Sequence, residues 1–102
     1  MLYLISYDAR NPDTTLDALD RRIAALGGVR VLETQWLIEP PGTLRATALW
    51  KELRRITSPN DGLLVAELTQ QIVWGTHGML VPDQEMERLR SCARSRQSLV
   101  KQ

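Results

Sequence analysis

The sequence predicts an α+β domain in which two helices cover one face of a four-stranded antiparallel sheet. Three observations lead to this fold class. The chain has 102 residues, the length of one compact domain. Its apolar residues form short strand-like runs in some segments and helical stripes in others. Turn residues separate these segments into the order strand, helix, strand, strand, helix, strand.

The first half of the chain predicts a strand, a helix and two short strands. Residues 2–7 are almost wholly apolar, as in a central strand. Thr14 and Asp17 form a capping pattern for a helix that the glycine pair 27–28 ends. The inward positions of this helix are Leu16, Leu19, Ile23 and Leu26. Residues 29–39 are rich in β-forming residues and predict two short strands with a tight turn near residues 33–35.

The second half predicts a helix, a strand and an extension. Thr43 is expected to cap a helix that runs to about Thr57. The inward positions of this helix are Ala46, Leu49, Leu53 and Ile56. After the turn at residues 58–62, a core strand is predicted at 63–68 and a fifth short strand at 70–74. Pro82 and Asp83 are expected to open a short helix that ends at about Ala93.

This order of elements is the split βαβ plan of ferredoxin-like domains. The right-handed crossover rule then favours the sheet order 4-1-3-2. We expect a ferredoxin-like βαββαβ domain over residues 1–74, with a four-stranded antiparallel sheet. Residues 75–102 are expected to form a C-terminal extension with a short helix and a basic tail.

Both faces of the predicted sheet are apolar. Leu2 and Leu4 alternate with Tyr3 and Ile5 along the first strand, whereas the two helices cover only one face. At about 25 cal/mol per Å2, leaving the second face in water forgoes several kcal/mol. A two-fold homodimer that packs sheet against sheet would cover it. The alternative is that the C-terminal segment folds back over this face.

Composition excludes several classes of protein. The net charge of +1 gives no general basic field, and the single Cys92 excludes an internal disulfide. His77 is the only histidine, so one chain offers no histidine metal cluster or Ser-His triad. The apolar N-terminus lacks a basic signal-peptide region, and no apolar run approaches the roughly 20 residues of a membrane span. We therefore expect a cytoplasmic protein with no membrane partner.

The order of several short motifs resembles the CRISPR-associated protein 2 family. An apolar first strand ends in Tyr7-Asp8, and a helix ended by glycines precedes the segment 30–36 with Thr34 before Trp36. After a second helix, Asp61 precedes the apolar strand at 63–65. The resemblance covers about residues 2–74. It departs from the family just after Asp8, where family members are often rich in Arg and Lys and this chain has one base.

The resemblance implies a dimeric ferredoxin-like protein associated with nucleic acid. Many family members are described as metal-dependent nucleases, and others bridge partner subunits and duplex DNA. The Asp that ends the first strand corresponds to Asp8, and the late Asp corresponds to Asp61. The Tyr, the Ser/Thr and the aromatic residue correspond to Tyr7, Thr34 and Trp36.

Asp8 is the candidate catalytic residue, and Asp8 and Asp61 are the candidate metal ligands. In the predicted sheet the last strand runs antiparallel beside the first, so the two carboxylates should lie on the same rim. Mg²⁺ is commonly held by one or two carboxylates together with waters and phosphates. Such an ion activates water for phosphodiester hydrolysis. The structural alternative is that both residues make local backbone hydrogen bonds beside turns.

Basic residues gather on the second helix and near the C-terminus, and they would bind phosphates. The candidates are Arg10, Arg45, Arg54, Arg55, Arg88, Arg90, Arg94 and Arg96. The alternative is a solvated helix face and a frayed tail. Together these observations suggest a dimeric nucleic-acid-associated protein. Its enzymatic form would be a magnesium-dependent endonuclease that acts on RNA or DNA through Asp8. The alternative is a non-catalytic dimer that binds a protein partner or bridges DNA.

Overall fold

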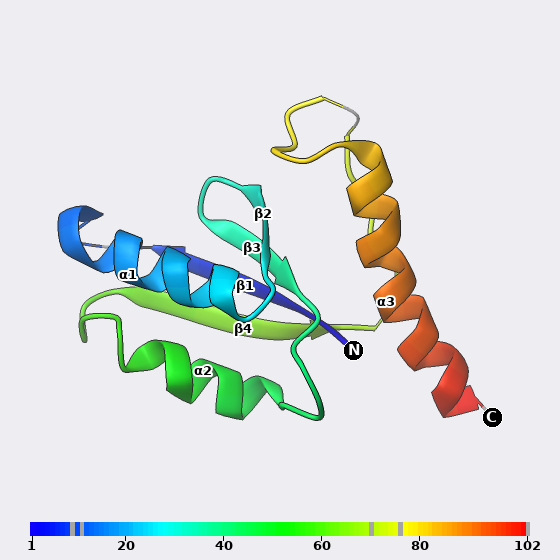
Figure 1. The fold of residues 1–102 in the computed structure, drawn as a ribbon, viewed down its shortest axis with the longest axis horizontal. Helices are drawn as coiled ribbons and strands as arrows, with labels where there is room; N and C mark the ends of the chain where they lie inside the picture. Colours follow the sequence, from blue (N-terminus) through cyan, green and yellow to red (C-terminus); the bar gives the residue numbers. More distant parts are fainter. Residues whose placement is uncertain (9, 11, 70, 76, 102) are drawn as a thin grey trace.

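A computed structural model (Figure 1) describes the backbone of the chain except at residues 9, 11, 70, 76 and 102, and describes no side chains at residues 12–16 and 94–101. Within these limits the elements are β1 (Leu2–Asp8), α1 (Pro12–Ala25), β2 (Val29–Leu32), β3 (Gln35–Ile38), α2 (Ala46–Arg54), β4 (Gly62–Leu68) and α3 (Asp83–Lys101). The predicted α+β class with a four-stranded antiparallel sheet is confirmed.

β1 is a central strand, as its apolar sequence predicted. The sheet order is β2-β3-β1-β4, which is β4-β1-β3-β2 when read from the other edge. β1 pairs with β4 along its whole length, from Leu2 opposite Leu68 to Asp8 opposite Gly62. β2 and β3 form the predicted pair of short strands, and a register irregularity lies between Arg30 and Leu32.

The first face of the sheet packs against α1 and α2 and holds the larger core. Side chains of β1, β3 and both helices meet in this cluster, and its buried members are Tyr3, Ile5, Tyr7, Leu19, Ile23, Trp36, Ile38, Leu49 and Leu53. The predicted inward positions Leu19, Ile23, Leu49 and Leu53 are therefore confirmed as core residues. Leu16 lies outside the described side chains.

Two glycines after α1 explain where this helix ends. Gly27 has a φ of +91°, a conformation that L side chains rarely adopt. A Cβ on Gly28 would lie 2.5 Å from the Ile23 Cγ2 atom, so a side chain there would force the chain away from the helix. The end of α1 therefore depends on both residues.

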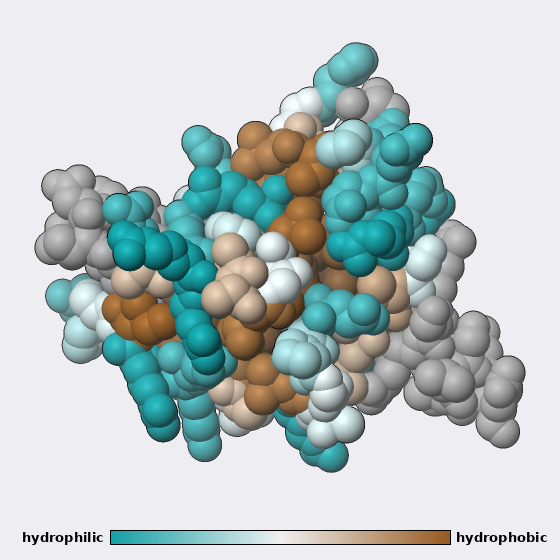
Figure 2. All heavy atoms as spheres, in the orientation of Figure 1, coloured by the Kyte–Doolittle hydropathy of each residue, from teal (hydrophilic) through white to brown (hydrophobic). Residues whose placement is uncertain are grey.

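α3 covers one end of the second face. Its apolar positions Met86, Leu89 and Ala93 follow helical spacing and pack with Leu2 and Leu37 of the sheet. Figure 1 shows α3 beside the end of β1 where the N-terminus lies, away from α1. In the same orientation, Figure 2 shows a band of apolar side chains between α1 and α3. The C-terminal segment thus folds back over this face, but only over part of it.

Four predicted boundaries are wrong. α1 begins at Pro12, before Thr14, because proline is favoured in a first helical turn. α2 begins at Ala46, so its N-cap is Arg45 instead of Thr43, and it ends at Arg54. α3 continues to Lys101, well beyond Ala93.

The fifth strand predicted at residues 70–74 is also wrong. Residues 71–75 contain no strand. Ile72 and Trp74 pack instead against the cluster that includes α3. No helix among the described residues combines the length and apolar character needed to cross a membrane.

Candidate functional site

Asp8 lies at the uncovered end of the second sheet face. Because side chains alternate along a strand, Asp8 shares this face with Leu2, Leu4 and Ser6. α3 packs at the Leu2 end, and six residues of extended chain place Asp8 roughly 20 Å further along the strand. The Asp8 side chain is exposed. Its position leaves the carboxylate accessible to solvent and to a ligand.

The neighbours of Asp8 on β4 leave this area open. Gly62 lies directly across from Asp8 and has no side chain to screen the carboxylate. Leu64 lies across from Ser6 and is 54% exposed, an unusual state for a leucine in a sheet. We call the surface formed by Ser6, Asp8, Gly62 and Leu64 the open face. It combines an apolar side chain with a carboxylate at its edge.

Asp61 shares the rim with Asp8 but already has two hydrogen-bond partners. Its carboxylate accepts the Arg10 backbone N–H at 2.7 Å and the Ser58 backbone N–H at 2.9 Å. The side chain is only 5% exposed. These hydrogen bonds lower the pKa of Asp61, and the bond from Arg10 has the larger effect. The carboxylate therefore joins the loop before β4 to the chain that follows β1, and its role as a metal ligand stays a prediction.

Replacing Asp61 with Ala should lower the melting temperature by about 5–10 °C, because two backbone N–H groups lose their acceptor. Differential scanning calorimetry at pH 7 measures this shift. Asp8→Ala is the matched control, since the Asp8 side chain is exposed, and its melting temperature should stay near that of the unaltered protein. Equal shifts in both variants would contradict the structural role of Asp61.

The same carboxylate should make stability depend on pH. The folded pKa of Asp61 lies below its unfolded value of about 3.9. Its stabilisation is thus complete above about pH 4 and is lost as the pH falls through the folded pKa. Part of the acid destabilisation of the protein should disappear in Asp61→Ala. An unchanged acid profile in this variant would show that other groups cause it.

Arg54 lies beside the same loop. Its guanidinium donates to the backbone carbonyl oxygens of Asp61 at 2.8 Å and of Pro59 at 3.0 Å. Arg10 and Arg55 are exposed, and Arg10 is tied to Asp61 only through its backbone N–H. The structure therefore brings Arg10, Arg54 and the two carboxyl residues to one end of the sheet.

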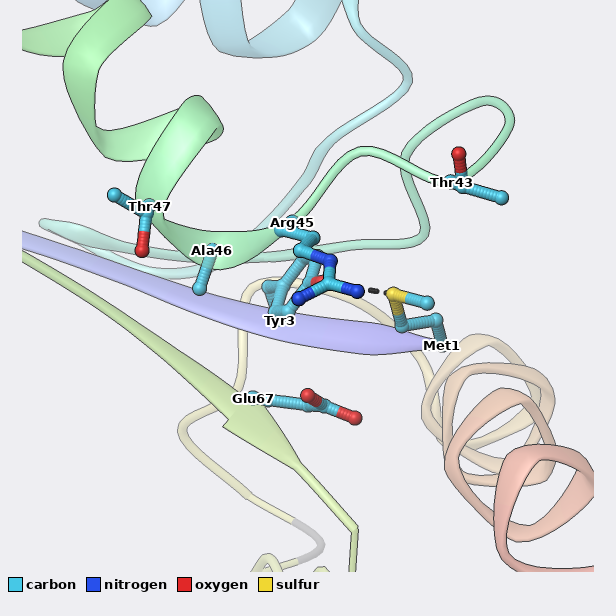
Figure 3. Close-up of a pocket in the computed structure, with 7 residues that line it drawn as sticks. All are labelled: Met1, Tyr3, Thr43, Arg45, Ala46, Thr47 and Glu67. Atoms are coloured by element: carbon cyan, nitrogen blue, oxygen red, sulfur yellow. Dashed lines mark hydrogen bonds between the residues drawn. The ribbon is translucent and has the colours of Figure 1, made fainter. Parts of the chain in front are cut away.

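Arg45 lies at the opposite end of β1. It lines a pocket of about 500 Å3 between the first turn of α2 and the start of β1. Figure 3 shows that this pocket is also lined by Tyr3 of β1 and by Glu67 of β4, which pairs with Tyr3 across the sheet. The Tyr3 hydroxyl donates to the Leu44 carbonyl oxygen at 3.0 Å. Arg45 is therefore not part of the Asp8 end.

Arg88 and Arg90 belong to α3, which packs at the Leu2 end of the sheet and not at the Asp8 end. Arg88 pairs with Glu85, and Arg90 pairs with Glu87 and stacks on the Trp74 ring. The side chains of Arg94 and Arg96 lie outside the described residues. Of the expected phosphate-binding residues that the structure describes, Arg10 and Arg54 lie at the Asp8 end, whereas Arg45, Arg88 and Arg90 do not.

A polar network beneath Asp8 was not found by sequence reasoning. The Tyr7 hydroxyl donates to one oxygen of Asp20, and Arg30 donates to the other. The Arg30 guanidinium also stacks on the Trp36 ring, 5.1 Å from its centroid. Burial, followed by the hydrogen bond with Asp20, raises the pKa of Tyr7. These contacts hold the end of β1 against α1 and β2.

The carboxylates fit a magnesium ion only in part. No group of three or more His, Cys, Asp or Glu residues that would hold a metal occurs among the described residues. Asp8 offers a free hard-oxygen ligand of the kind Mg²⁺ takes together with waters and phosphates. Among the described residues, Asp61 is the carboxylate that shares this rim, and another copy of Asp8 is the alternative source of a second ligand.

The chain was compared with protein-family models, with curated proteins and with solved structures, and none of them matches.

Proposed function

We propose that the chain is a cytoplasmic, ferredoxin-like homodimer of the CRISPR-associated protein 2 type that acts on RNA or DNA as a magnesium-dependent endonuclease. The sheet order, which is 4-1-3-2 when read from β4, supports the ferredoxin-like plan. The main support for this function is the exposed Asp8 carboxylate, which lies on a part of the sheet face that α3 does not cover.

The open face supports the homodimer. Leu64 remains 54% exposed there, and a second copy packed on the same face would remove it from water. A two-fold axis near this end brings the two copies of Asp8 together. Each copy then supplies a second carboxylate to the other.

The residues at this end have separate tasks in the proposed reaction. Asp8 of each subunit would hold the magnesium ion, which when bound polarises a phosphoryl oxygen and lowers the pKa of a water ligand. The exposed Arg10 side chain is placed to bind a neighbouring phosphate. Asp61 orients this segment through its bond to the Arg10 N–H.

Two observations favour a second candidate, a non-catalytic dimer that bridges DNA or binds a protein partner. Both oxygens of Asp61 already accept backbone N–H groups, which reduces the metal-binding capacity of the rim. Arg88 and Arg90 also have acidic partners. A dimer of this kind would use the same open face without cleaving nucleic acid.

The test of the proposed function is metal-dependent cleavage. Single- and double-stranded RNA and DNA are incubated with the protein and either Mg²⁺ or excess chelator, and light scattering gives the molar mass. We expect cleavage of at least one substrate with Mg²⁺, none with chelator, and twice the subunit mass. Salt-sensitive binding without cleavage would instead support the bridging dimer. A monomer that binds no nucleic acid would overturn both candidates.

A further inference from the structure

Trp50 occupies an unusual position on α2. Its indole N–H donates to the Leu63 carbonyl oxygen of β4 at 3.0 Å, yet the residue stays 37% exposed. Leu63 lies across from Tyr7, so Trp50 sits against the strand next to the one that ends in Asp8. The hydrogen bond fixes the ring beside β4, on the face that the helices cover and at the same end of β1 as Asp8.

Arg54 completes a stack on this ring. Its guanidinium carbon lies 5.8 Å from the centroid of the Trp50 ring. The same guanidinium is held by the carbonyl oxygens of Asp61 and Pro59. An ordered cation and an exposed aromatic ring therefore lie side by side at the Asp8 end, and neither requires a ligand to hold its position.

The surface around the stack is basic. Lys51 and Arg55 are exposed, and within the part of the chain that the structure describes they form no ion pair. The acidic residue of α2, Glu52, pairs with Arg22 of α1. Charge complementarity thus favours a polyanion along this side of α2.

We infer that Trp50 and Arg54 form a stacking site for one base of a single-stranded nucleic acid, with Lys51 and Arg55 binding its phosphates. This inference rests on the proposed function and specifies the substrate class of the same end of the molecule. Bases of a single strand are free to stack on an aromatic ring, and Arg adds cation–π attraction. Bases of a duplex are already stacked inside the helix, so a surface ring gains little from them.

The test measures the affinity of a fluorescent oligothymidine for the full chain carrying Asp8→Asn, which prevents cleavage. Trp50→Leu should weaken binding about tenfold, and Trp50→Phe should restore most of the affinity because it keeps an aromatic ring. Trp74→Leu is the matched control. Trp74 also lies under an arginine and donates a hydrogen bond to Asp83, but it lies beside α3. Its replacement should leave the affinity unchanged.

A second ligand separates stacking from charge. An oligonucleotide of the same length with abasic sites keeps its phosphates and should bind about equally to the Trp50→Leu variant and its parent. Arg55→Ser should reduce the salt dependence of oligothymidine binding, whereas Trp50→Leu should not. Equal affinity of Trp50→Leu and its parent for oligothymidine would overturn the stacking site and leave the proposed function intact. Failure of every variant and of the unaltered protein to bind any nucleic acid would overturn the proposed function itself.

Discussion

Replacing Asp8 with Asn should reduce the magnesium-dependent cleavage rate by at least about a hundredfold. The substitution keeps the size of the side chain but removes the negative charge with which a hard cation interacts. Asp8 is exposed and faces a glycine across the sheet, so the fold has no reason to change. Initial cleavage rates at saturating Mg²⁺ measure the effect.

Asp17→Asn is the control for this prediction. Asp17 is 78% exposed on α1, and its nearest charged partner, Arg21, is 4.0 Å away and also exposed. The same chemical change there should leave the rate unaltered. Oligonucleotide affinity of the Asp8→Asn variant should be retained, because the loss concerns the metal. A variant with full activity would show that cleavage arises elsewhere.

Replacing Asp20 with Ala should lower the free energy of unfolding by about 3 kcal/mol. Asp20 accepts hydrogen bonds from both the Tyr7 hydroxyl and the Arg30 guanidinium. Without the carboxylate, the Tyr7 hydroxyl and the Arg30 guanidinium have lost their shared hydrogen-bond acceptor in a partly buried site. Among the described residues, the buried Nε atom of Arg30 has no hydrogen-bond partner even in the unaltered protein. Urea unfolding followed by circular dichroism measures the change.

The matched control is Asp17→Ala, the same substitution one turn earlier on α1. This exposed residue should change the free energy of unfolding by less than about 0.5 kcal/mol. Similar losses in the two variants would mean that the Tyr7–Asp20–Arg30 network contributes no more than a surface charge.

The sequence predicted well those parts of the fold that depend on local pattern. Leu49 and Leu53 recur at helical spacing and are fully buried, and the glycines after α1 end it as expected. Helix starts were less predictable, because α2 begins after Arg45 with no side-chain cap even though Thr43 is nearby. The segment with Ile72 has strand-like residues, but packing against the α3 cluster decided its conformation.

Only those parts of the candidate site that depend on strand pairing were predictable from the sequence. The antiparallel pairing of β1 and β4 placed Asp8 and Asp61 at one end, as expected from the topology. The use of the Asp61 carboxylate by two backbone N–H groups depends on loop geometry that no sequence pattern specifies. Trp50 was missed because an aromatic residue beside buried leucines on a helix looks like another core residue. Only the structure shows its exposure.

The separation between α3 and Asp8 has a consequence for how this protein can change over generations. α3 meets the sheet around Leu2 and Leu37, at one extremity of β1, while the carboxylate lies at the other. Insertions, fusions or sequence changes in α3 would therefore alter the structure only around Leu2 and Leu37. They would not move Asp8. The C-terminal helix can therefore change in sequence or length while the opposite end of β1 keeps its arrangement.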